Sequence, residues 1–223
     1  MEFTPNLAML PPPQRRLWPE LTSTPEMFTL YGGTALALRL GHRASVDFDF
    51  SSNAPCNPDE LAQSLPYLKD AERIQVAPNT LTCRVDRGGP VLLSFFGNLG
   101  LGQVAAREHV QKMALYVASL LDLAGTKVAV IQQRAEVKDY LDIDALLQHG
   151  IDLSIALAAG AVVYGRSFNP LITLKALSYF DDVPMLAIDV RKRLTATVAG
   201  VDVTKLPVLI PYAKRPGDTR ETP

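Results

Sequence analysis

The fold is decided by residues 31–50, which read YGGTALALRLGHRASVDFDF. Gly32 and Gly33 lack a Cβ, so the backbone can turn sharply there and approach a bulky ligand closely. Residues 35–40 form a short apolar run at helical spacing, and residues 46–50 alternate apolar and acidic side chains. The stretch therefore predicts a strand, a glycine turn, a short helix, a loop and a second strand.

The second strand carries a pair of carboxylates. Side chains of a strand alternate between its two faces, so Asp47 and Asp49 project together while Val46, Phe48 and Phe50 point into a core. Two adjacent carboxylates repel each other unless a cation lies between them or one is protonated. Oxygen ligands suit Mg²⁺ or Mn²⁺, which complete their coordination with waters and substrate phosphates.

The glycine turn suits a phosphate. We expect Thr34 to be the N-cap of the short helix, whose N-terminus would offer free N–H groups and the positive end of its dipole to an anion. Taken singly, an Asp-x-Asp is most often a solvated strand face and a Gly-Gly is most often a turn. Their order and spacing together outline a phosphoryl-transfer site.

Composition limits the class of protein. The chain has 223 residues, 48% of them apolar, and a formal net charge of −1. It can bury a sizeable core, and any RNA contact must come from a local basic patch. Cys56 and Cys83 are too few for a disulfide framework or a zinc site, and no signal pattern begins the chain. The most apolar stretch, residues 153–164, is shorter than the ~20 residues that span a bilayer. We expect a cytoplasmic protein without membrane association.

Several further elements follow from local patterns. A helix is expected after Asn57-Pro58, and a β-hairpin is expected at residues 80–96 around the turn Asp-Arg-Gly-Gly. The second half of the chain is predicted to be helical, beginning at a capping box of Ser119 and Asp122. The first of the expected helices ends near residue 134. The others span residues 135–149, 153–164, 171–180 and 185–195.

The helical half contains a charged group. Lys127 lies inside the first of these helices, and Lys138, Asp139 and Asp142 lie on the second, with both aspartates on one face. Such charges are most often a solvated, salt-bridged face, and the stem of a lysine packs along its helix. The functional alternative is that Lys127 contacts nucleotide phosphates.

These motifs resemble those of a known family. Gly-Gly-Thr followed, after a short helix, by Asp-x-Asp resembles the signature of the polymerase-β-like nucleotidyltransferase superfamily. The fuller string, with Arg43 and Ser45, resembles the AbiEii/AbiGii nucleotidyltransferase toxins of bacterial abortive-infection and toxin–antitoxin systems. Residues 123–127 and the segment KDYLD at 138–142 resemble later motifs of the same family.

The resemblance implies a fold and an activity. The implied fold is α/β (α+β), with a nucleotidyltransferase-type mixed sheet and flanking helices at residues 1–115, a helical part at 116–204 that contributes to the site, and a flexible tail at 205–223. The implied activity is Mg²⁺-dependent transfer of a nucleoside monophosphate from an NTP to an acceptor hydroxyl. The acceptor would be RNA, such as a tRNA end, or a protein, and the partner would be a cognate antitoxin.

The resemblance also implies roles for individual residues. Asp47 and Asp49 would hold the metal and act in catalysis together with Lys127, and Asp139 would act in catalysis or brace the site. Asp142 would orient Lys127 or Arg134, and Arg43 would pair with an aspartate or touch phosphate. The residues implied to bind nucleotide are Gly32, Gly33, Thr34, Arg43, Ser45 and Lys127; the supporting residues are Lys138, Asp142 and Ser94.

Ser94 departs from the superfamily pattern. It occupies the strand position at which polymerase-β-like enzymes commonly carry a third carboxylate, and a hydroxyl is neither a strong metal ligand nor a base. Two other functions stay open, the first because of Ser94 and the second because small-molecule enzymes share the superfamily signature. One is a nucleotide-binding or interaction module with impaired catalysis, and the other is a small-molecule nucleotidyltransferase of the antibiotic-modifying kind.

Overall fold

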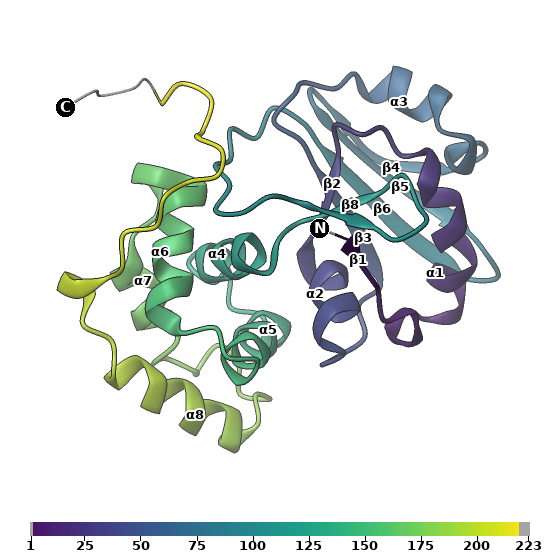
Figure 1. Cartoon of the computed structure of the whole chain (residues 1–223). Coiled ribbons are helices and arrows are strands. Elements are labelled where there is room, and N and C mark those ends of the chain that lie inside the picture. The colour runs from purple at the N-terminus through teal and green to yellow at the C-terminus, as the bar shows by residue number, and fades with distance from the viewer. Residues whose placement is uncertain (1, 219–223) are drawn as a thin grey trace. The chain divides into compact units, whose positions relative to one another are not determined.

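A computed structural model describes residues 2–218 of the chain, which divide into two compact units (Figure 1). The sheet unit comprises the residues up to Gly100 together with Arg107–Ala118. The helical unit comprises Leu101–Ala106 and the residues from Ser119 onward.

The sheet unit contains one mixed sheet of eight strands among the described residues. Its spatial order is β1-β7-β8-β2-β3-β6-β5-β4. The pairs β1–β7, β2–β8 and β3–β6 are parallel, and the others are antiparallel. The strands are β1 (Glu2–Phe3), β2 (Thr29–Tyr31), β3 (Asp47–Ser51), β4 (Glu72–Ala77), β5 (Thr80–Asp86), β6 (Pro90–Phe96), β7 (Glu108–Val110) and β8 (Tyr116–Val117). The predicted mixed α/β architecture is confirmed.

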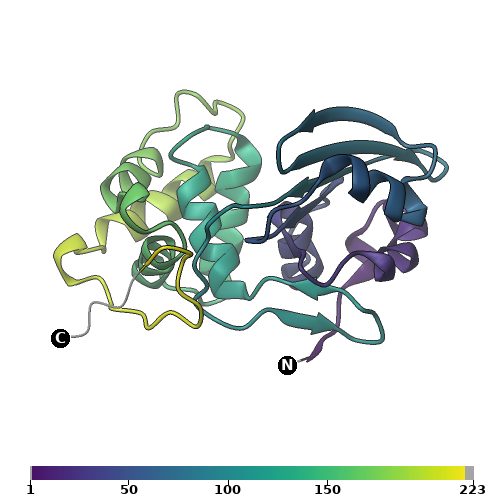
Figure 2. The ribbon, with the colours of Figure 1, turned by 90° about the horizontal axis from the view of Figure 1, so that it is seen from above.

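Three helices accompany this sheet: α1 (Pro12–Leu17), α2 (Gly32–Leu40) and α3 (Pro58–Ser64). Short 3₁₀ segments lie at Leu7–Met9, Trp18–Ser23 and Pro66–Leu68. Asn57 caps α3 as predicted, because its side chain accepts the Asp59 N–H at 3.0 Å. Helix α1 contacts β6 and α3 contacts β5, and Figure 2 shows both helices against the sheet.

One face of the sheet is an aromatic core. Phe48 and Phe50 of β3 are fully buried; Phe50 stacks on Phe95 of β6 with ring centroids 5.1 Å apart, and Phe48 packs near Trp18 at 6.1 Å. The predicted core position of Val46 is wrong, because Val46 precedes β3 and is 60% exposed. The alternation therefore begins at Asp47, and it turns the acidic residues of β3 toward the other face.

Gln14 of α1 is an anomaly in this core. It is 2% exposed, and neither its Oε1 nor its Nε2 has a hydrogen-bond partner among the described residues. We expect Gln14→Met to raise the free energy of unfolding by about 1–2 kcal/mol, because an unpaired buried polar group costs about 1–3 kcal/mol. Chemical denaturation measures the change. Gln63→Met, at an exposed position of α3, is the control; a less stable Gln14→Met protein would contradict the prediction.

The helical unit consists of α4 (Leu120–Val130), α5 (Val137–Gln148), α6 (Leu153–Tyr164), α7 (Pro170–Ala176) and α8 (Ile188–Ala199), with 3₁₀ turns at Gly165–Ser167 and Val203–Lys205. Helices α4 and α6 pack closely because α4 has a glycine at their contact. A Cβ at Gly125 would lie 2.8 Å from the carbonyl carbon of Ala159 in α6. Arg193 of α8 joins α5 by donating to both carboxylate oxygens of Asp144, at 2.9 and 2.7 Å. The predicted bounds of α6 are confirmed.

Asp122 explains why Leu101–Ala106 belongs to the helical unit. The Ser119 hydroxyl caps α4 by accepting the Asp122 N–H at 3.0 Å, as the capping box predicts. The Asp122 carboxylate accepts from the N–H groups of Val104 and Ala105 at 2.6 and 3.4 Å, as well as from the Ser119 hydroxyl at 2.6 Å. Burial raises the pKa of Asp122, against the lowering effect of these hydrogen bonds.

The C-terminal segment is attached to the helical unit at two points. Gln103 and Ala213 exchange backbone hydrogen bonds of 2.8 and 3.2 Å, and Arg215 Nη1 donates to the Tyr164 carbonyl at 2.8 Å. These contacts fall within the predicted tail at 205–223, of which residues 219–223 lie outside the described part.

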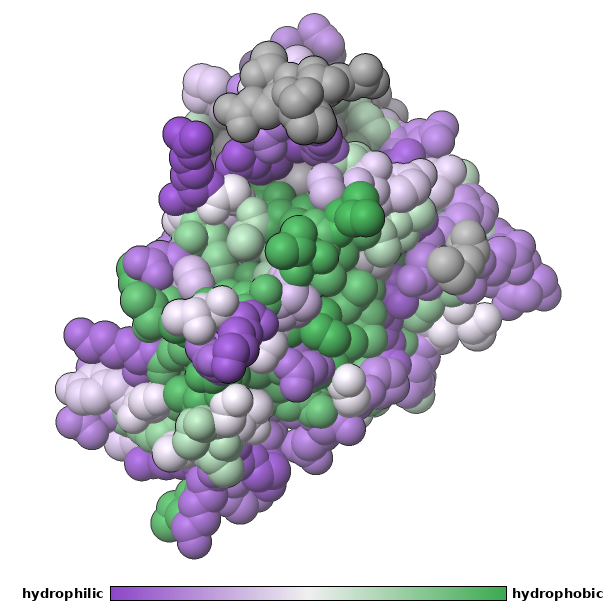
Figure 3. Space-filling view, turned by 60° about the vertical axis from the view of Figure 1, so that its left-hand side comes forward, coloured by the Kyte–Doolittle hydropathy of each residue, from purple (hydrophilic) through white to green (hydrophobic). Residues whose placement is uncertain are grey.

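The helical unit also presents apolar side chains to solvent. Figure 3, turned toward this unit, shows apolar areas in the middle of one face with polar side chains around them. The exposed large apolar residues of the helical unit include Leu171, Met185, Ile188, Val208 and Ile210. Among the described residues, no single helix combines the length and apolar composition needed to cross a bilayer; only the bent pair Val137–Gln148 and Leu153–Ser167 meets that test jointly.

Candidate active site

The acidic pair lies on the central strand of the polar sheet face. Asp47 and Asp49 are two residues apart on β3, so their side chains share the face opposite Phe48. Asp49 pairs with Tyr31 of β2 on one side and with Ser94 of β6 on the other. The acids therefore lie between the strand that leads into the glycine turn and the strand that carries Ser94.

The glycine turn lies directly against Asp49. Gly32 has φ +73°, a left-handed conformation that side chains rarely adopt, and a Cβ there would lie 2.4 Å from Asp49 Oδ2. A Cβ at Gly33 would lie 2.7 Å from Arg43 Nη2 and 3.0 Å from Ser45 Oγ. The sheet unit thus brings together the predicted residues of the turn, the loop and the strand.

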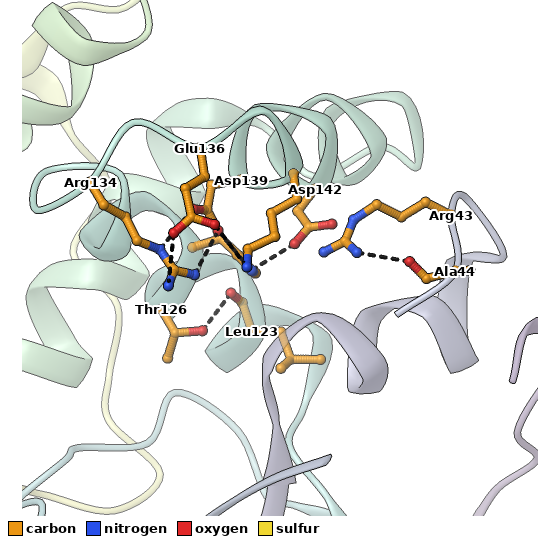
Figure 4. A network of polar contacts seen from close by, with 10 residues as sticks. Arg43, Ala44, Leu123, Thr126, Arg134, Glu136, Asp139 and Asp142 are labelled. Atoms are coloured by element: carbon orange, nitrogen blue, oxygen red, sulfur yellow. Dashed lines mark hydrogen bonds and ion pairs between the residues drawn. The ribbon is translucent and has the colours of Figure 1, made fainter. Parts of the chain in front are cut away.

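Arg43 lies in the loop between α2 and β3. Its Nη1 donates to the carbonyl of Ala44 at 2.9 Å, which Figure 4 shows. The guanidinium reaches Gly33 with Nη2 while the loop backbone holds Nη1. Arg43 consequently places positive charge beside the glycine turn, where a phosphate would meet backbone N–H groups.

The expectation that Thr34 is the N-cap is wrong. Helix α2 begins at Gly32, its N-cap is Tyr31, and no side chain caps it. Thr34 is 1% exposed and donates its hydroxyl hydrogen to the backbone carbonyl of Asp47. The hydroxyl therefore joins α2 to β3, and it is the uncapped N–H groups of the helix start that remain for an anion.

The acidic pair fits a divalent cation. Asp47 Oδ1 is buried and has no hydrogen-bond partner among the described residues. A buried carboxylate oxygen without a partner is costly unless a cation or a proton meets it. Within residues 2–218 no group of three or more His, Cys, Asp or Glu side chains could hold a metal. The fit is therefore to Mg²⁺, which takes one or two carboxylates and obtains its other ligands from water and substrate.

Ser94 lies beside Asp49 in strand register and is hydrogen-bonded to another hydroxyl. The Thr82 hydroxyl of β5 donates to Ser94 Oγ at 3.3 Å, and the two residues are paired in register. A hydroxyl pair thus continues the polar row where a third carboxylate would stand. The sequence did not predict a role for Thr82. The alternation of β5 puts Thr82 on the face opposite to that of buried Leu81 and Cys83, but its position beside Ser94 depends on strand register.

A second charged cluster lies within the helical unit (Figure 4). Lys127 of α4 has its Nζ 3.1 Å from Asp139 Oδ1 and 2.6 Å from Asp142 Oδ2. Arg134 Nε donates to Asp139 Oδ2 at 3.0 Å. Both aspartate side chains are fully buried and the Lys127 side chain is 7% exposed. The group is thus a buried network rather than a solvated helix face.

Helical periodicity explains this arrangement. Asp139 and Asp142 are three residues apart on α5, so they lie on one face toward α4. Asp142 contacts Lys127, one of the two residues that the sequence offered as its partner. Lys138 lies farther out, 45% exposed, and pairs with Glu136 at 2.8 Å. This lysine lowers the pKa of Glu136 by donating a hydrogen bond to its carboxylate, with further lowering from the charge of Arg134.

The fold that carries the acidic strand is similar to that of solved nucleotidyltransferase toxins. The nucleotidyltransferase toxin MenT4 of Mycobacterium tuberculosis has a similar structure, with a TM-score of 0.58 and 19% identity over 86% of this chain and 83% of that one. A protein of H. pylori described as a possible nucleotidyltransferase gives a TM-score of 0.53 and 16% identity over 83% of this chain and 90% of that one.

The chain belongs to the AbiEii nucleotidyl transferase toxin family of type IV toxin–antitoxin systems, whose family model matches residues 16–207. An uncharacterized protein of Aquifex aeolicus is 30% identical over 158 residues, which are 70% of this chain and 74% of that protein. The family predicted from residues 31–50 and 123–142 is confirmed.

Proposed function

We propose that this protein transfers a nucleoside monophosphate from an NTP to an acceptor hydroxyl in a reaction that depends on Mg²⁺ or Mn²⁺. The observation that carries the proposal is the contact between Gly32 and the Asp49 carboxylate, beside the unpartnered Oδ1 of Asp47. It joins a backbone turn that suits phosphate to an acidic pair that suits a cation. Both features are needed for nucleotidyl transfer.

The sheet unit supplies the metal and phosphate contacts in this proposal. Asp47 and Asp49 hold the cation, which would neutralise charge on the triphosphate and orient it. Gly33 offers backbone N–H to a phosphate, and Arg43 and Ser45 lie beside it with a guanidinium and a hydroxyl that can donate. Because glycine at these positions carries no side chain, the phosphate can approach the backbone directly.

The helical unit supplies a second set of charges in this proposal. Lys127 contacts a nucleotide phosphate, Asp142 orients its ammonium, and Asp139 acts in catalysis or braces the network, with Lys138 in support. The two carboxylates hold the Lys127 ammonium at one point, and their contacts leave one of its three N–H donors for an anion. A lysine fixed in this way loses little freedom when it meets an anion.

The biological setting follows from the family. A type IV toxin has a cognate antitoxin, and we propose that this chain acts in the cytoplasm as such a toxin, with RNA, such as a tRNA end, or a protein as acceptor. Arg191 and Arg193 of α8 are engaged by backbone carbonyls and by Asp144. These contacts use part of the donor capacity of both guanidinium groups and leave less of it for an RNA acceptor.

The test is transfer of label from α-³²P NTPs to total RNA or to protein by purified chain with Mg²⁺. We expect Asp47→Asn and Asp49→Asn each to lower transfer by about 100-fold or more, a loss like that from removing one electrostatic stabiliser of a transition state. Asp70→Asn, at an exposed acid of the same unit, is the control. Unchanged transfer by Asp47→Asn would rule out the metal assignment.

A second candidate rests on Ser94, which replaces a carboxylate beside Asp49 with a hydroxyl bound by Thr82. This favours a nucleotide-binding module with impaired catalysis. Calorimetry that shows Mg²⁺-dependent NTP binding, without labelled product on RNA or protein, would select it. The same assay with aminoglycosides as acceptors identifies a small-molecule nucleotidyltransferase instead.

A further inference from the structure

The Thr34 hydroxyl makes a hydrogen bond within the protein. Thr34 lies in the first turn of α2 and is 1% exposed. Its hydroxyl donates to the backbone carbonyl of Asp47. A threonine hydroxyl has a single hydrogen, so this bond uses its whole capacity as a donor.

This hydrogen bond limits how the Thr34 hydroxyl can interact with a nucleotide. A phosphate oxygen is an acceptor and needs a donor, whereas Thr34 has only lone pairs left. Lone pairs facing an anion are repulsive. The neighbouring phosphate contacts must then come from backbone N–H groups, from Arg43 and from the Ser45 hydroxyl, which can donate hydrogens.

The hydrogen bond from Thr34 also lies beyond the point where β2 stops pairing with β3. On the side of α2, strand β2 pairs with β3 only from Ser51 back to Asp49. Asp47 lies beyond this ladder and is paired only with Leu92 of β6 on its other side. The Thr34 hydroxyl therefore replaces the missing strand partner at the end of β3 that carries Asp47.

We propose that Thr34 is a positioning residue for the metal pair and not a ligand of the nucleotide. By fixing the backbone of Asp47 against α2, it sets the place of the unpartnered Oδ1 relative to the Asp49 carboxylate, which the turn at Gly32 abuts. The inference rests on the proposed function only in that Asp47 and Asp49 bind a divalent cation. Its consequence is that loss of the hydroxyl weakens metal binding and leaves metal-free nucleotide binding unchanged.

The test measures Mn²⁺ binding to the full chain without nucleotide, by electron paramagnetic resonance. We expect Thr34→Val to bind Mn²⁺ about 10-fold more weakly than the wild type, the lower end of the effect of losing a group that orients a metal ligand. Thr34→Ser keeps the hydroxyl and should restore wild-type affinity. Thr24→Val is the matched control: Thr24 is a buried threonine of the same unit whose hydroxyl bonds to Tyr67 at 2.8 Å.

A second measurement excludes a phosphate contact. Binding of a fluorescent NTP analogue in EDTA should be the same for Thr34→Val and the wild type. Weaker nucleotide binding in EDTA, or wild-type Mn²⁺ affinity in Thr34→Val, would overturn the proposal, as would equal losses in Thr24→Val. Should Thr34→Val not fold, Thr34→Ala makes the same comparison. A wild type that binds Mn²⁺ yet transfers no nucleotide would refute the proposed function. The inference about Thr34 would then still be decided by the Mn²⁺ affinity of Thr34→Val.

Discussion

Replacing Gly32 with alanine is expected to abolish most nucleotidyl transfer and metal binding. The added Cβ would lie 2.4 Å from Asp49 Oδ2 and 3.2 Å from its Cγ. The carboxylate must therefore move by about 1 Å to reach ordinary contact, and a misplacement of that size can lower a reaction rate about 100-fold. Transfer of labelled nucleotide and Mn²⁺ binding by paramagnetic resonance measure the two losses.

Backbone strain must be separated from displacement of the carboxylate. Alanine at a left-handed φ costs about 1–2 kcal/mol wherever it occurs. Gly88, in the hairpin turn of the same unit, has φ +72°, against +73° for Gly32, and its neighbour is the side chain of Arg16. Gly88→Ala should lose similar stability and keep transfer and Mn²⁺ affinity. If both variants lose activity alike, strain alone accounts for the effect.

Replacing Lys127 with methionine is expected to destabilise the helical unit by about 3–5 kcal/mol, the usual cost of breaking a buried ion pair from one side. Arg134 still neutralises Asp139, but Asp142 loses the ammonium at 2.6 Å while its side chain stays fully buried. Far-ultraviolet circular dichroism follows the helices during denaturation. Trp18, the single tryptophan, reports the sheet unit separately by fluorescence.

Two variants make the Lys127 result specific. Lys138→Met removes an exposed lysine of α5 that pairs with half-exposed Glu136, and should cost less than about 1 kcal/mol. Lys127→Met combined with Asp142→Asn removes both charges and should recover part of the stability. This double variant should still not transfer nucleotide if Lys127 contacts phosphate. A Lys127→Met protein as stable as Lys138→Met would contradict the buried pairing as the source of stability.

Local patterns were enough for the central elements of the fold. The alternation of residues 46–50 predicted a strand, and its polar positions became the acidic face of β3. The apolar run at 153–164, preceded by Asp152, predicted α6 with its observed bounds. These predictions succeed because turns, caps and the periods of helix and strand are set by neighbours in the chain. The family was recognisable for the same reason, since its motifs are short and contiguous.

Other strands had no local signal. Strand β4 is the last strand of the sheet, and most of its residues are exposed on both faces, including Ile74 and Val76. An edge strand of this kind lacks the alternation that burial of one face imposes. Strands β1, β7 and β8 have two or three residues each. β7 and β8 pair with each other locally, but β1 pairs with β7 and β8 pairs with β2 across long stretches of sequence.

The sequence by itself determined which residues could serve the chemistry: two aspartates on one strand face, a glycine turn before them, and lysine and aspartates at helical spacing. Tertiary structure alone decided what each touches. It put Ser94 beside Asp49 and gave the Thr34 hydroxyl to the carbonyl of Asp47. It also buried Asp142 against Lys127. Strand register and helix packing depend on contacts between distant segments, and a hydroxyl or ammonium binds whichever acceptor the packing brings within reach.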